Sequence, residues 1–147
     1  MAGLNLTIKI DDLKARELFD DLERFDALPM WEDIGEYLTS ETARRFDREI
    51  DAEGNRLKPS RRAELGGGKT LVEYGHLRDS YSYVTLLDRT GIEFGSNLDY
   101  AAIHQFGGKT GRGHRTVLPP RAILGINADD EREIEDIVLD HVRGLLR

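Results

Sequence analysis

Residues 93–108 read EFGSNLDYAAIHQFGG, which predicts the end of a strand, a tight turn and a short helix. The turn is placed at Gly95–Asn97, because glycine and asparagine tolerate positive φ and serine and asparagine side chains bond their own backbone. Asp99 is expected to cap the helix by accepting amide hydrogens of its first turn. Gly107 and Gly108 then favour the left-handed conformation in which helices often end.

The apolar side chains of this short helix fall on one face. Ala102, Ile103 and Phe106 recur at helical spacing. We expect Tyr100, Ile103 and Phe106 to be buried anchors of the core. The residues on the polar edge of the segment are Tyr100, His104 and Gln105. A rigid segment that is apolar on one side is typical of a packed structural corner, whereas a catalytic centre needs convergent reactive groups.

Four segments of the chain together resemble a known family. Besides residues 95–108, they are IGEYL at 34–38, YGHLRDS at 74–80, and LPPR at 118–121 followed by ILG at 123–125. In this order and at these spacings they resemble the phage virion morphogenesis family, the tail-completion proteins of Mu-like and P2-like phages. The motif residues to which the resemblance gives a structural role are Gly95, Asn97, Tyr100, Ala101, His104, Gln105, Phe106, Gly107, Gly108, Pro119 and Arg121.

The resemblance implies a structural protein without enzymatic activity. Such a protein completes a phage tail at its head-proximal end, so that the tail can join a filled head. It is expected to act as a ring of identical subunits, hexameric because tails are, in contact with tail and head–tail connector proteins. Its place would be the virion, and the host cytoplasm during assembly. A cellular sequence of this type would come from a prophage.

Length and composition are those of one globular domain, residues 1–147. Apolar residues make up 39% of the chain and charged residues 33%, and there is no cysteine. Disulfides and thiolate metal sites are therefore excluded. No apolar run approaches the roughly 20 residues that span a bilayer, and no signal peptide is visible. We expect neither a membrane partner nor a cofactor.

The predicted fold is α+β, with a small, mainly antiparallel sheet packed against two N-terminal helices and a C-terminal helix, and with two long basic loops. Residues 4–10 alternate like a half-buried strand. Helices are expected at 11–25 and 30–51, strands at 81–87 and 92–94 around a turn at 88–91, and a last helix after Asn127. The residues expected to face inward are Leu18, Phe19, Leu22, Phe25, Trp31, Ile34, Leu38, Phe46, Ile50, Ile134, Ile137, Val138, Val142 and Leu145. The arginines placed on the outer side of the second helix are Arg44, Arg45 and Arg48.

Charge is distributed unevenly along the chain, whose net charge is −7. Residues 1–53 carry 15 acidic and 7 basic side chains, residues 54–121 carry 6 and 11, and residues 122–147 carry 7 and 3. Two acidic flanks thus enclose a basic middle. Such asymmetry can steer charged partners or let identical subunits pack head to tail. The simpler alternative is a set of solvated helices beside basic loops.

The basic middle contains two glycine-rich segments, 54–70 and 107–121. Residues 54–70 and 107–116 are expected to be exposed loops that are mobile in the free subunit. Their bases that could contact a subunit or DNA are Lys58, Arg61, Arg62, Lys69, Lys109, Arg112 and Arg115. The loops lack interleaved aromatic residues and the chain is acidic, so subunit contact is preferred to a channel crossed by DNA. The alternative function is a nucleic-acid-binding module that uses both segments.

Signals for other chemistry are absent from the sequence. The loops at 66–70 and 107–110 resemble phosphate-binding loops, but Ala63 and Ile103 stand where the first glycine is needed. The four histidines are His76, His104, His114 and His141. No pair of them has the i,i+4 spacing of a zinc motif. No Gly-x-Ser-x-Gly elbow presents a nucleophile, and the sequence predicts no enzyme.

Overall fold

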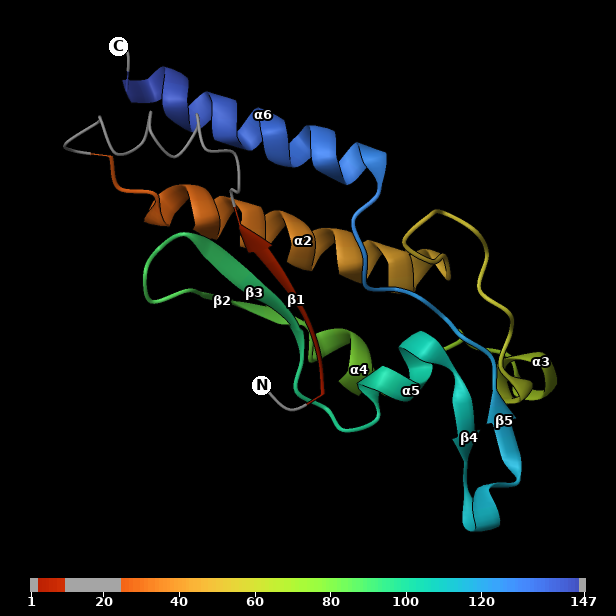
Figure 1. Cartoon of the computed structure of the whole chain (residues 1–147). Helices are drawn as coiled ribbons and strands as arrows, with labels where there is room; N and C mark the ends of the chain where they lie inside the picture. The colour runs from red at the N-terminus through yellow and green to blue at the C-terminus, as the bar shows by residue number, and fades with distance from the viewer. Residues whose placement is uncertain (1–2, 10–24, 146–147) are drawn as a thin grey trace.

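The computed structural model describes residues 3–9 and 25–145, and these form an α+β fold, as predicted. A three-stranded antiparallel sheet has the order β1 (Leu4–Lys9), β3 (Gly91–Ser96), β2 (Ser82–Thr85). Helix α2 (Leu28–Arg48) packs against the sheet, and α6 (Ala128–Leu145) lies on the other side of α2 (Figure 1). The predicted helix at 11–25 falls, apart from Phe25, outside the described residues.

Helix α2 supplies the largest share of the core of any single element. It begins with Pro29 in its first turn, where the missing N–H costs no hydrogen bond. Its sheet-facing side buries five apolar residues, which are Met30, Trp31, Ile34, Leu38 and Phe46. The predicted inward face is confirmed for four of these, but the helix ends at Arg48 and Ile50 instead bridges to Arg56. Arg45 was predicted to lie outside and is only 2% exposed.

The sheet follows the alternation of its sequence. Leu4, Leu6 and Ile8 pair with Ser96, Phe94 and Ile92, respectively. The predicted turn after β2 is confirmed, because the Thr90 amide donates to Asp88 Oδ1 at 3.1 Å and Leu86 donates to Gly91 at 2.9 Å. The predicted strand 81–87 is shorter than expected, since a helical turn, α4 (His76–Asp79), precedes β2.

Strand β3 continues further than predicted. Gly95 and Ser96 are not turn residues but pair with Asn5 and Leu4 of β1. A Cβ at Gly95 would collide with the β1 backbone, so the position requires glycine for close approach of two strands. The turn starts only at Asn97, which is exposed.

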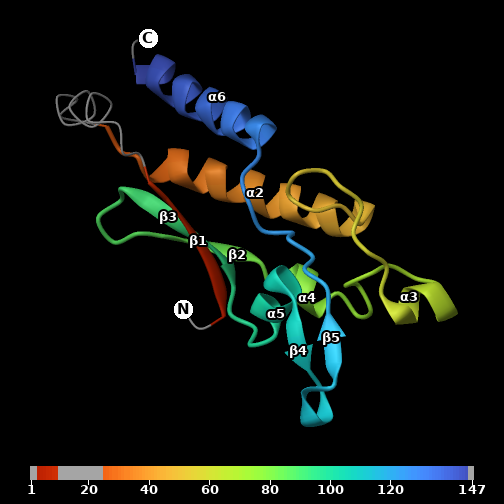
Figure 2. The same ribbon diagram turned by 45° about the vertical axis from the view of Figure 1, so that its right-hand side comes forward.

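The basic middle of the chain contains more regular structure than expected. Helix α5 (Ala101–Phe106) leads into a hairpin of β4 (Gly108–Thr110) and β5 (Thr116–Leu118), with a 3-10 turn, η1 (Arg112–His114), at its tip. The hairpin projects away from α6 in both views (Figures 1 and 2). Residues 107–116, predicted to be an exposed and mobile loop, are largely exposed but form a regular hairpin, and their mobility stays a prediction. The other basic segment contains α3 (Arg61–Gly66) and is anchored by the buried Leu57.

Helix α6 begins as the sequence indicated. Asn127 Oδ1 accepts from the Asp130 amide at 2.9 Å, and the Asn127 amide donates to Asp130 Oδ2 at 2.9 Å. This reciprocal arrangement is a capping box. The inward stripe of α6 is half-buried and consists of Ile134, Ile137, Val138 and Val142. Leu145, predicted to be inward, is exposed.

Candidate interaction surface

The corner formed by α5 is tied to the chain segment that follows the hairpin. Gln105 is 9% exposed, and its amide forms two hydrogen bonds with the backbone of Leu124. Nε2 donates to the Leu124 carbonyl at 2.7 Å, and Oε1 accepts from the Leu124 amide at 3.0 Å. A side-chain amide that bonds one residue in this way imitates a strand neighbour. Gln105 therefore fixes the position of the segment leaving the hairpin.

Gly107 allows the two arms of the hairpin to meet at its base. The backbone there has φ +70°, which favours glycine. A Cβ would lie 2.7 Å from the Leu118 carbonyl oxygen and 2.8 Å from the Pro120 nitrogen. The Gly107 amide donates to Ile103 at 2.8 Å and so ends α5, as the sequence predicted. Gly108 follows as the first residue of β4, and Pro119 leaves the hairpin after β5.

Arg121 is a buried arginine that joins three segments. It is 4% exposed, and burial lowers the pKa of its guanidinium. Its amide donates to the His104 carbonyl at 2.8 Å, while its Nε donates to the Lys58 carbonyl at 2.7 Å. A second nitrogen reaches the Pro59 carbonyl at 3.3 Å. The side chain is thus used inside the fold and cannot contact DNA.

The outer side of α5 differs from the prediction. Ala101 and Gln105 are buried, whereas Phe106 is 69% and Tyr100 43% exposed, so neither of these aromatic residues is a core anchor. Asp99 does not cap the helix, since the capping position is Tyr100 and no side chain bonds there. The polar Gln105 occupies the inward position of this six-residue helix, because the backbone of Leu124 lies there and bonds its amide.

A pocket of about 240 Å³ opens between α4 and α5. Its lining includes Tyr74, His76, Tyr100 and His104. Burial, followed by the positive charge of Arg121, lowers the pKa of His104 and so favours its neutral imidazole. His104 Nδ1 is buried without a hydrogen-bond partner among the described residues. Residues 3–9 and 25–145 contain no group of three or more side chains that could together bind a metal ion.

The predicted contact bases separate into two groups. Arg62 donates to the Lys69 carbonyl, and Lys69 donates to the Asp47 carbonyl, each at 2.7 Å, so both are engaged within the subunit. The bases that have no acidic partner in the described part of the chain are Lys58, Arg61, Lys109, Arg112 and Arg115. The last three belong to the hairpin, where Val117 is also 69% exposed. The hairpin therefore presents positive charge beside an apolar side chain.

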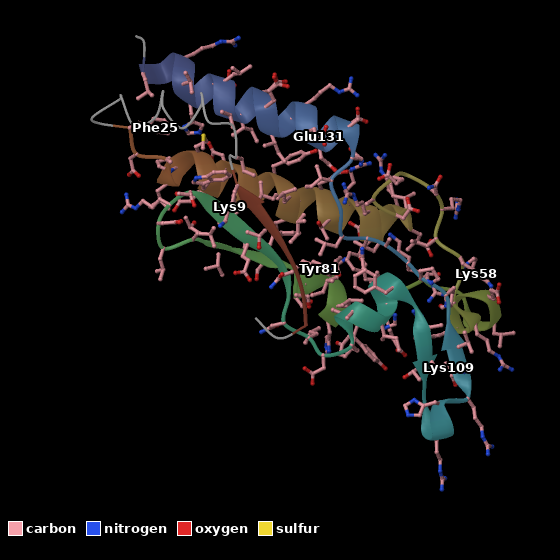
Figure 3. The ribbon with its side chains drawn as sticks, in the orientation of Figure 1. Lys9, Phe25, Lys58, Tyr81, Lys109 and Glu131 are labelled. Carbon is pink, nitrogen blue, oxygen red and sulfur yellow. The ribbon has the colours of Figure 1, made fainter. Side chains whose placement is uncertain are left out.

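The acidic end of the molecule lies far from this hairpin. Helix α6 carries Asp129, Glu133, Asp136 and Asp140, which are all exposed. Lys109 on the hairpin and Glu131 at the start of α6 lie on opposite sides of the subunit in Figure 3, with α2 between them. The charge asymmetry of the sequence is thus also an asymmetry in space.

Comparisons with known proteins show the family to which this chain belongs. The sequence model of the phage virion morphogenesis family matches residues 12–143 of this chain. The chain belongs to this family. A protein described as Mu-like prophage FluMu G protein 2, from Haemophilus influenzae, is 30% identical over 145 residues, or 95% of this chain and 99% of that protein. No solved structure matches this chain.

In this phage virion morphogenesis protein, three of the four motif segments meet at the corner, whereas 34–38 lies in α2, where Gly35 packs against the ring of Tyr83. The segments 74–80 and 100–108 line the pocket, and 118–125 is bonded to α5. The sequence reasoning missed Arg45 and the exposed Val117. Arg45 could have been found, because it stands seven residues after Leu38 and eleven after Ile34, in the centre of the apolar face of α2.

None of the helices in residues 3–9 and 25–145 is long and apolar enough to cross a membrane.

Proposed function

We propose that this protein completes the phage tail at its head-proximal end and so enables the tail to join a filled head. The observation that carries the proposal is the exposed hairpin surface held by a rigid corner. Phe106 and Val117 are each 69% exposed although they adjoin tightly bonded backbone. Large apolar side chains displayed on a fixed support are typical of surfaces that other proteins cover. In a morphogenesis protein those partners are virion components.

The proposed action is structural, by assembly and without catalysis. Identical copies form a ring, hexameric to match the tail, between the tail and the head–tail connector proteins. The protein resides in the virion and, during assembly, in the host cytoplasm. Its similarity to a protein described as Mu-like prophage supports an origin from a prophage.

Electron microscopy of lysates tests this function. A phage or induced prophage lacking the gene should produce filled heads and separate tails, since only the joining step is lost. Adding purified protein to that lysate should restore joined particles. Normal virions from the deletion would overturn the proposal, and so would a lysate with heads but no tails, which would place the protein earlier in tail assembly.

A nucleic-acid-binding module is the second candidate. It is favoured by Lys109, Arg112 and Arg115, which lie together on a segment without an acidic residue. Phosphate contacts by these bases would give DNA affinity that falls steeply between low and moderate salt. Fluorescence anisotropy with labelled duplex DNA over a salt series measures this. Absence of binding at low salt removes this candidate.

A further inference from the structure

The hairpin of β4 and β5 has the properties of one half of a contact. Its bases Lys109, Arg112 and Arg115 are exposed and have no acidic partner in the described chain. Val117 on the same hairpin is 69% exposed. Residues 107–121 contain no acidic side chain, so nothing within the hairpin neutralises this charge. A partner with acidic groups and some apolar surface fits it.

Such a partner is present in the same molecule, out of reach of its own hairpin. Asp129, Glu133, Asp136 and Asp140 follow one another at helical spacing along one side of α6 and are exposed. Leu139, next to this row, is 39% exposed. Because α6 and the hairpin lie at opposite ends of the subunit (Figures 1 and 2), the two surfaces can meet only between two copies.

We propose that the hairpin of one copy docks on the acidic side of α6 of the next copy. This deepens the ring arrangement of the proposed function, on which it rests, by naming the two surfaces that join. The contact is heterologous, because different surfaces of identical subunits meet, and repetition of such a contact closes a ring when the rotation between copies allows it. Val117 and Leu139 supply the apolar part. Ile123, in the segment that follows the hairpin, is only 1% exposed and is not available to this contact.

A second copy explains the hairpin better than DNA does. Basic surfaces that bind single-stranded nucleic acid usually also carry aromatic side chains, on which the nucleobases stack. Residues 107–121 contain no phenylalanine, tyrosine or tryptophan. The chain as a whole is acidic, at −7, and would repel DNA beyond the hairpin. The acidic helix is, by contrast, an attractive partner.

Two charge-reversed proteins test the contact. One carries Arg112→Glu and Arg115→Glu, and the other carries Glu133→Lys and Asp136→Lys. Sedimentation velocity at low salt should show self-association of the wild type, weakened by raising the salt because exposed charges are screened. Each reversed protein alone brings like charges together, and its association should fall by about tenfold or more. An equal mixture should recover association, since each hairpin then meets an α6 of opposite charge.

The matched control carries Lys58→Glu and Arg61→Glu, which change the net charge by the same amount outside the hairpin. It should associate like the wild type. A control as weak as the hairpin variant, a mixture that stays dissociated, or a wild type that remains monomeric at low salt would each overturn the proposed contact. DNA binding lost only in the hairpin variant, with self-association intact, would assign the hairpin to nucleic acid instead.

A cross-link gives a second measurement that does not depend on charge. The chain has no cysteine, so Thr116→Cys in one protein and Asp136→Cys in another introduce single thiols at the two surfaces. Mild oxidation of the mixture should give disulfide-linked dimers. As a control, a mixture of the Thr116→Cys protein with a Val84→Cys protein should give no such cross-linked dimer, because Val84 lies on the exposed outer face of the sheet. These assays use the free protein, so their failure would leave the tail-completion result in lysates unaffected.

Discussion

The buried pair of Arg45 and Asp130 makes the sharpest prediction about stability. Arg45 lies in α2, and its guanidinium contacts the Asp130 carboxylate at the start of α6, with both side chains almost fully buried. Asp130 also accepts from Tyr37 at 2.8 Å and from the Asn127 amide at 2.9 Å. We expect Asp130→Ala to be strongly destabilising.

The magnitude follows from what the substitution leaves behind. Removing one partner of a buried ion pair typically costs 3–5 kcal/mol, because the other charge stays buried and uncompensated. Arg45 would keep two backbone carbonyl contacts, to Ile123 and Gly125, each at 2.9 Å. Those contacts place the ion-pair loss near the lower limit, and loss of the cap on α6 adds about 1 kcal/mol. We therefore expect Asp130→Ala to lower the free energy of unfolding by about 3–4 kcal/mol, a large part of the 5–15 kcal/mol usual for a domain.

Urea unfolding followed by fluorescence measures the effect, because Trp31 is the only tryptophan and is 2% exposed. Asp129→Ala is the matched control, since the neighbouring Asp129 is exposed and its pair with Arg132 lies in solvent. The control should cost less than about 1 kcal/mol. If the two variants were equally stable, the pair would not hold α6 in place and the reasoning would be refuted.

Three further predictions follow from the corner and the core. Gly107→Ala should cost about 2 kcal/mol more than Gly54→Ala, because both have positive φ but only Gly107 lacks room for a Cβ; equal costs in urea unfolding would contradict this. Phe106→Ala should cost less than about 1 kcal/mol while weakening assembly, whereas Phe94→Ala, at a position 1% exposed, should cost about 3–5 kcal/mol. Burial raises the pKa of Tyr81 to about 12, so its protonated hydroxyl contributes stability that is fully present below pH 10, and this contribution, roughly 3 kcal/mol at most, is lost as the pH rises from 10 to 12. Tyr81→Phe should flatten this alkaline decline, and an unchanged slope would refute the assignment.

Periodicity predicted the parts of the fold that have one apolar side. The alternation at 4–10 and the stripe of α2 gave correct elements, because sheet and helix each repeat a simple spacing over several residues. The cap at Asn127 was also predictable, since capping depends on residues a few positions apart. Local physical chemistry was sufficient in these cases.

The corner was predicted less well, because long-range backbone contacts decide its conformation. Phe106 was assigned to the core from its apolar character, but Gln105 occupies the inward position, where the Leu124 backbone offers a donor and an acceptor. Gly95 was assigned to a turn, although the approach of β1 makes it a strand residue. Propensity cannot reveal a partner that is 19 or 90 residues away in the chain.

The segment 121–127 shows how the two ends of the subunit are held at a fixed angle. It leads from the hairpin to α6, and nearly every residue along it is bonded to another element. Gln105 bonds Leu124, Arg45 bonds Ile123 and Gly125, and the Ala52 amide donates to Ala122 at 2.8 Å. Closure of the proposed ring requires the same rotation at every contact. The hairpin and the acidic side of α6 must therefore keep a fixed position relative to each other within a subunit. The buried polar contacts along this segment provide this constraint. In the proposed ring, Arg45 inside the apolar face of α2 helps to hold the hairpin and α6 at a fixed angle.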